Sequence, residues 1–205
     1  MSSPAKINYT NGIVICHGKS EVCMVKYITS NLHLTIKQFS KDNGKHSIQI
    51  TDLKTYLDAK PFKNKTSFQS EYAVEIKGKG SNMTIENFKL FIIMDTDDCT
   101  SQQKADFINK EMFKSHWLYD YIVPIYSIRS LEDVLLECGI MAKRIRNKDK
   151  GTYYEKIFPI NDKPFSNDTE AEIKLFRDKI QKSERTNLNE FVDYCLDLAQ
   201  KNKFK

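Results

Sequence analysis

Acidic side chains gather where the most apolar segment of the chain ends. Residues 89–94 read Lys-Leu-Phe-Ile-Ile-Met, a run typical of a buried parallel strand, and Asp95-Thr96-Asp97-Asp98 follows at once. Crowded carboxylates repel one another, and a divalent cation relieves that repulsion. Oxygen ligands completed by water and phosphate suit Mg²⁺ or Mn²⁺ in phosphoryl transfer, so this cluster of carboxylates is a predicted metal site. The alternative is a solvated acidic turn that caps the next helix.

A second polar cluster, His17-Gly18-Lys19-Ser20-Glu21, follows the apolar run at residues 13–16. A glycine between a strand and a helix lets the backbone approach a phosphate, and a helix N-terminus favours an anion. We predict phosphate or nucleic-acid contacts at these cationic and glycine positions: Gly18, Lys19, Lys45 and Arg129. The alternatives are an ordinary turn before a helix capped by Ser20, and solvated surface cations.

Short apolar strands alternate with helices in the segments that must position these clusters. Strands are predicted near residues 13–16, 34–39, 89–94 and 121–126, and helices near 20–31, 48–57, 100–114 and 131–138. This alternation favours an α/β Rossmannoid fold, a parallel sheet with helices on both faces. Ligands bind such sheets beyond the carboxyl ends of the strands, where both polar clusters fall. Pro124 predicts that the last strand lies at an edge.

The pattern of predicted elements changes near residue 147. We predict an α/β domain at 1–146 and a helical extension at 147–205 that packs on the same core. A charged linker is expected at 148–151, helices at about 169–181 and 187–200, and a frayed basic end after them.

Composition narrows the functional classes. Hydrophobic residues make up 40% of the 205 positions, enough for a real core, and the net charge of +5 permits a polyanionic partner. Five scattered cysteines without a CxxC pair argue against a disulfide or zinc framework. The sequence shows neither an apolar leader nor a run of about 20 apolar residues. We therefore expect a reduced, soluble, cytoplasmic protein without a membrane partner.

Taken in order, the two polar clusters resemble the motifs of the toprim domain, shared by topoisomerases, bacterial primases and small nucleases of the OLD and RNA-maturation types. In that family a first strand ends in Glu-Gly with an acidic residue a few positions on, and a later strand ends in Asp-x-Asp. Gly18 and Glu21 match the first motif, and Asp95 and Asp97 match the second, which implies that Asp95 and Asp97 are the metal ligands. The resemblance covers residues 13–139 and implies a toprim-like sheet.

The segment 129–133, Arg-Ser-Leu-Glu-Asp, is similar to an Arg-x-x-Glu-acidic stretch of toprim nucleases. The resemblance implies that Glu132 and Asp133 complete a second metal position, although the first turn of a helix also favours acids. His17 stands where the family has its catalytic glutamate. Histidine can move a proton or ligate a metal, so the resemblance implies catalytic roles for His17 and for Glu21, which supplies a carboxylate.

The resemblance implies a Mg²⁺-dependent toprim-type nuclease, or a related phosphoryl-transfer enzyme, that acts on RNA or DNA in phage defence or RNA processing. The main alternative is a catalytically degenerate toprim-like module that binds nucleic acid or a partner protein. A nucleotide-binding phosphotransferase is a third reading, but phosphate-loop and dinucleotide fingerprints are missing. The C-terminal helices could mediate a homodimer or hold a partner subunit.

Other reactive or aromatic residues have ordinary structural interpretations. Trp117, Tyr119 and Tyr121 could stack on unpaired bases, although core packing is the expected role. A nucleophilic pair of Cys16 and His17 is disfavoured because neighbouring residues on a strand point to opposite faces.

Overall fold

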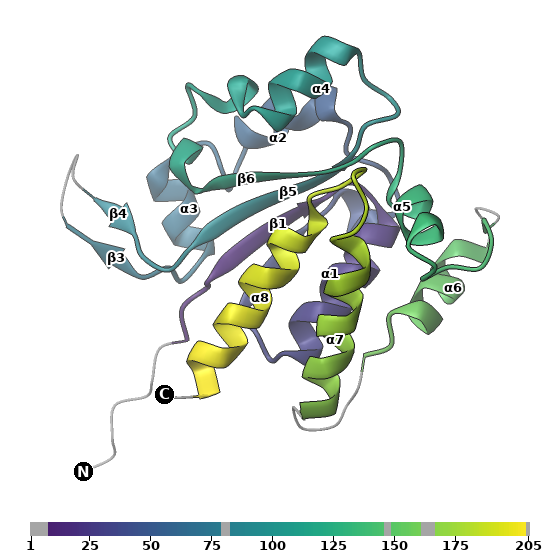
Figure 1. The fold of residues 1–205 in the computed structure, drawn as a ribbon. Coiled ribbons are helices and arrows are strands. Elements are labelled where there is room, and N and C mark those ends of the chain that lie inside the picture. The colour runs from purple at the N-terminus through teal and green to yellow at the C-terminus, as the bar shows by residue number, and fades with distance from the viewer. Residues whose placement is uncertain (1–7, 79–82, 146–148, 161–166, 204–205) are drawn as a thin grey trace.

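The computed structural model describes residues 8–78, 83–145, 149–160 and 167–203, and its centre is a parallel sheet (Figure 1). The sheet has the order β2-β1-β5-β6. Its strands are β1 (Gly12–Cys16), β2 (Ile36–Phe39), β5 (Lys89–Asp95) and β6 (Ile122–Ser127). Strands β3 (Ile76–Lys77) and β4 (Thr84–Ile85) form an antiparallel hairpin apart from it. The prediction of an α/β fold with a parallel sheet flanked by helices is confirmed.

Alternating side chains of the central strands supply two apolar cores. Ile13 and Ile15 of β1 point to one face, whereas Val14 and Cys16 point to the other. The first face is covered by α2 (Leu53–Leu57), α3 (Lys65–Glu71) and α4 (Ser101–Ile108). The second is covered by α1 (Lys19–Asn31), α5 (Leu131–Glu137), α6 (Lys150–Ile157), α7 (Asn167–Ile180) and α8 (Leu188–Lys203). In Figure 1, α7 and α8 lie side by side on this face, and α1 also packs against α8.

Several helix boundaries differ from the predictions for local reasons. Gly18, rather than Ser20, is the N-cap of α1, since Gly18 has extended backbone angles and its N–H donates to Glu21. Helix α4 ends at Ile108 instead of continuing to residue 114, because Lys110 adopts a left-handed conformation with φ of 64°. Thr100 caps α4 as predicted, since its hydroxyl accepts a hydrogen bond from the Gln103 N–H at 3.2 Å.

The C-terminal part of the chain is more helical than the sequence indicated. Helix α6 begins at Lys150, inside the segment predicted as a linker, and residues 146–148 lie outside the described part. Helix α8 continues to Lys203, where a frayed end was expected. The ammonium group of Lys203 lies 2.6 Å from Glu170 of α7, and Lys174 with Lys203 lowers the pKa of Glu170 to about 2. This contact ties the end of α8 to α7.

Strand β6 is an edge strand, as Pro124 predicted, and a connecting segment covers its outer side. Asn187, just before α8, accepts a hydrogen bond from the Tyr126 N–H at 2.9 Å and donates to the Pro124 carbonyl at 3.0 Å. The Thr186 hydroxyl donates to the Tyr126 carbonyl at 2.7 Å. These contacts take the place of a neighbouring strand along β6.

The connections of the sheet reverse direction between β1 and β5. From β1 the chain passes to β2 on one side and later returns to β5 on the other. Such a switch point separates the loops that leave two neighbouring strands, and ligands of open α/β sheets bind there. His17 directly follows β1, and Asp95 ends β5. The strand order therefore brings the two predicted polar clusters to one place.

Candidate functional site

His17 is held by three contacts to the main chain. Its N–H donates to the Ile93 carbonyl at 3.0 Å, and its carbonyl accepts from the Ile48 N–H at 2.8 Å. The ring atom Nδ1 lies 2.9 Å from the Ile48 carbonyl oxygen. Because a carbonyl oxygen can only accept, Nδ1 carries the hydrogen of this bond. The other ring nitrogen, Nε2, is thereby directed at Asp95.

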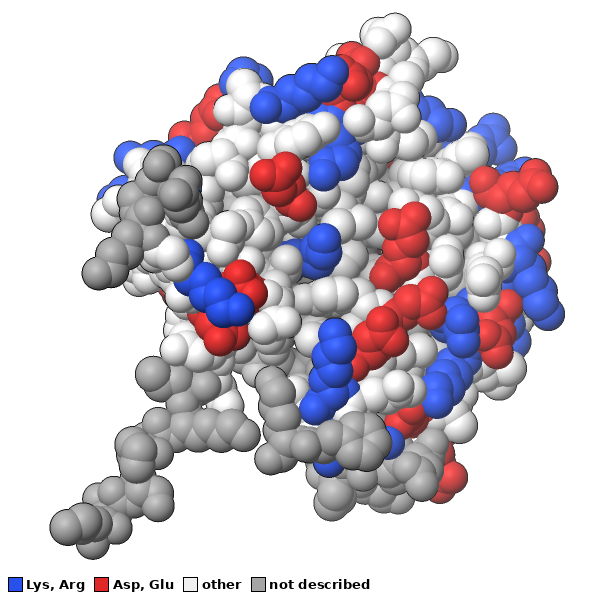
Figure 2. All heavy atoms as spheres, turned by 60° about the vertical axis from the view of Figure 1, so that its left-hand side comes forward, with Lys and Arg blue, Asp and Glu red and all other residues white. Residues whose placement is uncertain are grey.

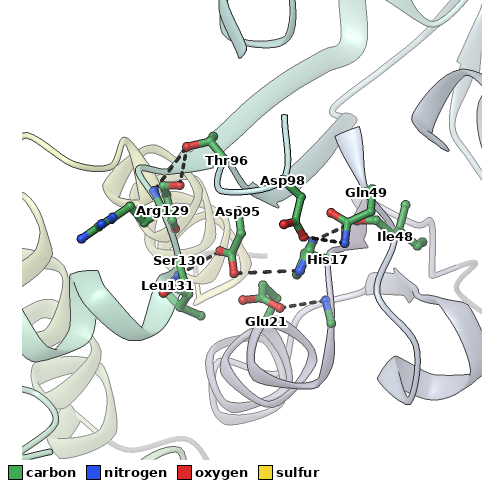
Figure 3. Close-up of polar contacts among 12 residues, drawn as sticks. His17, Glu21, Ile48, Gln49, Asp95, Thr96, Asp98, Arg129, Ser130 and Leu131 are labelled. Atoms are coloured by element: carbon green, nitrogen blue, oxygen red, sulfur yellow. Dashed lines mark hydrogen bonds and ion pairs between the residues drawn. The ribbon is translucent and has the colours of Figure 1, made fainter. Parts of the chain in front are cut away.

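Asp95 faces His17 from the neighbouring strand (Figure 3). Its Oδ2 lies 4.0 Å from His17 Nε2, and both side chains are nearly buried, at 13% and 12% exposure. Its Oδ1 accepts a hydrogen bond of 2.8 Å from the Leu131 N–H in the first turn of α5. The 4.0 Å separation is too long for a direct hydrogen bond and is a distance that one water can bridge.

Glu21 lies beneath this pair, in the first turn of α1. It is only 2% exposed, and its Oε2 accepts a 2.8 Å hydrogen bond from the Gly18 N–H. A Cβ atom at Gly18 would meet only ordinary contacts, with Glu21 Oε2 at 3.5 Å and Ser47 Oγ at 3.6 Å. Since the backbone of Gly18 is extended, the fold does not require glycine at this position.

The loop after β2 lies against the start of α1. Asp42, Asn43 and Gly44 have φ values of 48°, 56° and 82°, a left-handed run that only a constrained turn maintains. A Cβ atom on Gly44 would lie 3.0 Å from Lys19 Cα, which is closer than nine in ten real Cβ contacts. The exposed residues Lys19 and Lys45 thus belong to adjacent segments, as candidate phosphate contacts beside the site.

This geometry predicts unequal effects of alanine at two glycines. Gly139 has φ of 63°, and a Cβ atom added there would meet no atom within 4 Å, so Gly139→Ala should cost only the left-handed backbone penalty, about 1–2 kcal/mol. Gly44→Ala should lower the free energy of unfolding further, because its Cβ also presses on the Lys19 backbone. Chemical denaturation measures both, and equal losses would contradict the close packing of this loop.

Glu132 and Asp133 diverge in the first turn of α5. Glu132 is buried, and its Oε1 accepts a 2.9 Å hydrogen bond from the Ile145 N–H. Asp133 forms an ion pair with Arg144 instead. Both residues therefore hold the segment after α5, and the second metal position that the resemblance implied stays a prediction.

The remaining predicted residues lie at the rim. Asp97 and Asp98 are exposed, and Asp98 accepts a 2.9 Å hydrogen bond from the Gln49 side chain. Figure 3 shows the Arg129 side chain directed away from Asp95 and His17, while its N–H donates to the Thr96 hydroxyl at 3.3 Å. The main-chain N–H of Thr96 donates to the carbonyls of Ser127 and Arg129, which joins the ends of β5 and β6.

The side chains of the site offer a metal ion only part of a coordination shell. Within residues 8–78, 83–145, 149–160 and 167–203, no group of three or more His, Cys, Asp or Glu side chains is arranged to hold one. Mg²⁺ in phosphoryl-transfer sites is often held by one or two carboxylates, with water and substrate phosphate supplying the other oxygens. The chemistry of Asp95 and Asp97 fits a metal of that kind, and the described residues form no complete protein cage.

Other candidate groups have structural roles. The thiol of Cys16 is fully buried, and burial raises its pKa well above the ordinary value, so it is not a nucleophile beside His17. Trp117 packs edge-on against Phe68 and donates to the Phe62 carbonyl at 2.7 Å. Trp117, Tyr119 and Tyr121 are partly buried and pack against the core of the first face. All five cysteines are free thiols.

Two hollows lie elsewhere on the described surface. One, of about 260 Å³, is lined by residues that include Lys65, Trp117 and Tyr121, at the amino end of β6. The other, of about 220 Å³, is lined by residues that include Cys138 and Lys179, beyond α5. Neither is lined by a predicted site residue.

Comparison with known proteins gives no relative: no family model, curated protein or solved structure matches the chain. Among the helices that the structure describes, none is long and apolar enough to cross a bilayer.

Sequence reasoning missed one contributor to the site and one helix beside it. Ile48 acts through its main-chain carbonyl, which no residue type reveals. Tyr154 lies on α6, which packs on α1, but the charges and glycine around residue 150 suggested a linker. The pair Tyr154 and Phe158, four positions apart, was the signal for a helix there.

Proposed function

We propose that this chain is a Mg²⁺-dependent phosphoryl-transfer enzyme of toprim type that cleaves nucleic acid. The observation that carries the proposal is the orientation of His17, whose Nε2 is directed at the Asp95 carboxylate at the switch point of the sheet. A proton-transfer group and a carboxylate at this position are the elements that hydrolysis of a phosphodiester needs.

The proton chemistry follows from the ring orientation. With Nδ1–H bound to Ile48, neutral His17 keeps a lone pair on Nε2 and can accept a proton from a water. The imidazolium that forms is stabilised by the Asp95 carboxylate 4.0 Å away. Asp95 is itself oriented by the Leu131 N–H. His17 therefore acts as general base, in place of the glutamate of the toprim motif.

The acidic residues have distinct roles in this proposal. Asp95 and Asp97 hold Mg²⁺, which when bound neutralises phosphate charge and lowers the pKa of water. Glu21 fixes the Gly18 backbone at the start of α1. Gly18 lets a phosphate approach that backbone, and Lys19 and Lys45 contact neighbouring phosphates from their adjacent segments.

Binding of a polyanion depends here on local contacts. Figure 2 shows basic and acidic side chains interspersed on the side of the molecule that carries the β3–β4 hairpin, at the amino ends of the strands. The net charge of +5 is modest for a nucleic-acid-binding protein. We therefore expect weak, strongly salt-dependent binding, with a metal ion needed to hold the scissile phosphate.

The test combines metal titration with cleavage. Calorimetry of Mg²⁺ and Mn²⁺ with wild type and the double variant Asp95→Ala/Asp97→Ala is run beside cleavage assays on mixed RNA and single-stranded DNA. We expect wild type to bind metal and cleave, and the double variant to do neither. Cleavage that survives the double substitution or persists in EDTA would refute the proposal.

A second candidate, a binding module without catalysis, is favoured by two observations. The described residues contain no three-side-chain metal group, and His17 departs from the toprim glutamate. Tight binding of nucleic acid without metal and without turnover would identify this function in the same experiment.

A further inference from the structure

Tyr154 carries a buried hydroxyl at the end of a tightly packed ring. Tyr154 lies on the inner side of α6, and its side chain is fully buried. Its ring stacks on that of Phe158, with centroids 6.2 Å apart and an interplanar angle of 10°. Its Oη has no hydrogen-bond partner among the described residues. The Ser20 hydroxyl is close enough to influence it but lies outside hydrogen-bond geometry. Buried hydroxyls nearly always have partners, so this one needs an explanation.

The surroundings of this hydroxyl are those of the candidate site. Burial raises the pKa of Tyr154, and the carboxylates of Glu132, Glu21 and Asp95 raise it further. The phenol therefore keeps its proton and is a hydrogen-bond donor. Helix α6 packs on α1, and the neighbour of this donor in the first turn of α1 is Ser20.

We propose that the Tyr154 hydroxyl is a positioning group of the candidate site, which hydrogen-bonds an ordered water that donates to Asp95 and to one of the buried carboxylates Glu21 and Glu132. The inference rests on the proposed function, because the water orients Asp95, one of the two residues that would hold Mg²⁺. A buried water needs two to four polar partners, and the phenol, the Ser20 hydroxyl and these carboxylates supply them. The phenol donates to the water, and the water donates to two acceptors.

The experiment compares isosteric variants for Mg²⁺ binding and thermal stability. Tyr154→Phe removes only the hydroxyl, and Tyr153→Phe makes the same change at the half-buried neighbour on α6. Loss of a group that orients metal ligands typically weakens binding by about tenfold to a hundredfold. We expect such a loss in calorimetry for Tyr154→Phe, with Tyr153→Phe within about twofold of wild type and both proteins folded.

Each other outcome has a definite meaning. A Tyr154→Phe protein that melts higher than wild type and binds Mg²⁺ with wild-type affinity shows that the hydroxyl was merely unsatisfied, which overturns this inference but leaves the proposed function. Wild type that binds no Mg²⁺ refutes both. If Tyr154→Phe fails to fold, Ser20→Ala is measured in its place. The inference expects Ser20→Ala to weaken Mg²⁺ binding, because this variant removes the second hydroxyl beside the water. An unchanged affinity of Ser20→Ala for Mg²⁺ overturns the inference.

Discussion

Replacing Asp95 by asparagine should weaken Mg²⁺ binding strongly and reduce cleavage by about 10²–10³-fold, the effect of losing several kcal/mol of transition-state stabilisation. Asparagine has the shape of aspartate and retains an oxygen that can accept the 2.8 Å hydrogen bond from the Leu131 N–H. The anchor to α5 therefore survives, while the charge that attracts a cation is lost. Calorimetry and a cleavage assay on the folded variant measure the two effects.

Asp58→Asn is the matched control for Asp95→Asn. Asp58 is exposed and pairs with Lys54 at 2.8 Å on the surface of the first face. Exposed pairs of this kind contribute about 0–1 kcal/mol, so both activity and stability should stay near wild type. An Asp95→Asn protein that cleaves as fast as Asp58→Asn would show that Asp95 has only a structural role at the start of α5.

His17→Gln should lower cleavage by about 10²–10⁴-fold, the usual contribution of a positioned proton-transfer group. The glutamine amide can still donate to the Ile48 carbonyl, so the segment after β1 should keep its conformation. Mg²⁺ binding should be retained, since Asp95 and Asp97 are intact. The variant thereby separates proton transfer from metal binding, and single-turnover kinetics measure the loss.

His17→Glu tests the departure from the toprim motif directly. Glutamate restores a carboxylate general base, so this variant should recover at least part of the activity lost in His17→Gln. It also places a negative charge about 4 Å from Asp95, a repulsion of about 4 kcal/mol at an effective dielectric constant of about 20. We therefore expect a lower melting temperature without Mg²⁺ and recovery when Mg²⁺ is added.

His46→Gln serves as the control for both His17 variants. His46 is exposed and lies 2.8 Å from the Asp42 carboxylate in the loop after β2. It should leave cleavage unchanged within about twofold. Equal activities of His46→Gln, His17→Gln and wild type would remove His17 from the proposed mechanism.

The fold was largely predictable because the strands are strongly apolar and are followed by polar turns. The run at 89–94 became β5, and Pro124 identified β6 as an edge strand. Helix α6 was not predicted, because it is stabilised by tertiary burial of Tyr154 and Phe158 rather than by local propensity. Helix α4 is shorter than predicted because Lys110 is left-handed, a conformation that the residue type lysine does not predict.

The candidate site was predictable in its residues and less so in its contacts. Strand ends indicated that His17 and Asp95 would be neighbours, and the pairing of β1 with β5 brings them together. Hydrogen bonds to main-chain atoms orient the His17 ring and the Asp95 carboxylate, and such bonds cannot be predicted from residue types. The ion pair of Asp133 with Arg144 could not be predicted either, since other basic residues also lie near Asp133 in the sequence.

The segment before α8 covers the outer edge of β6, and the two edges of the sheet therefore differ in how easily another strand could pair with them. Asn187 and Thr186 already bond to main-chain atoms at Pro124 and Tyr126, so another chain cannot add a strand there without displacing the start of α8. Such caps protect edge strands against aggregation. Strand β2 pairs within the sheet only with β1 among the described residues. If the sheet is extended by a strand from another chain, that strand would therefore pair with β2, and strands would be added at this edge alone.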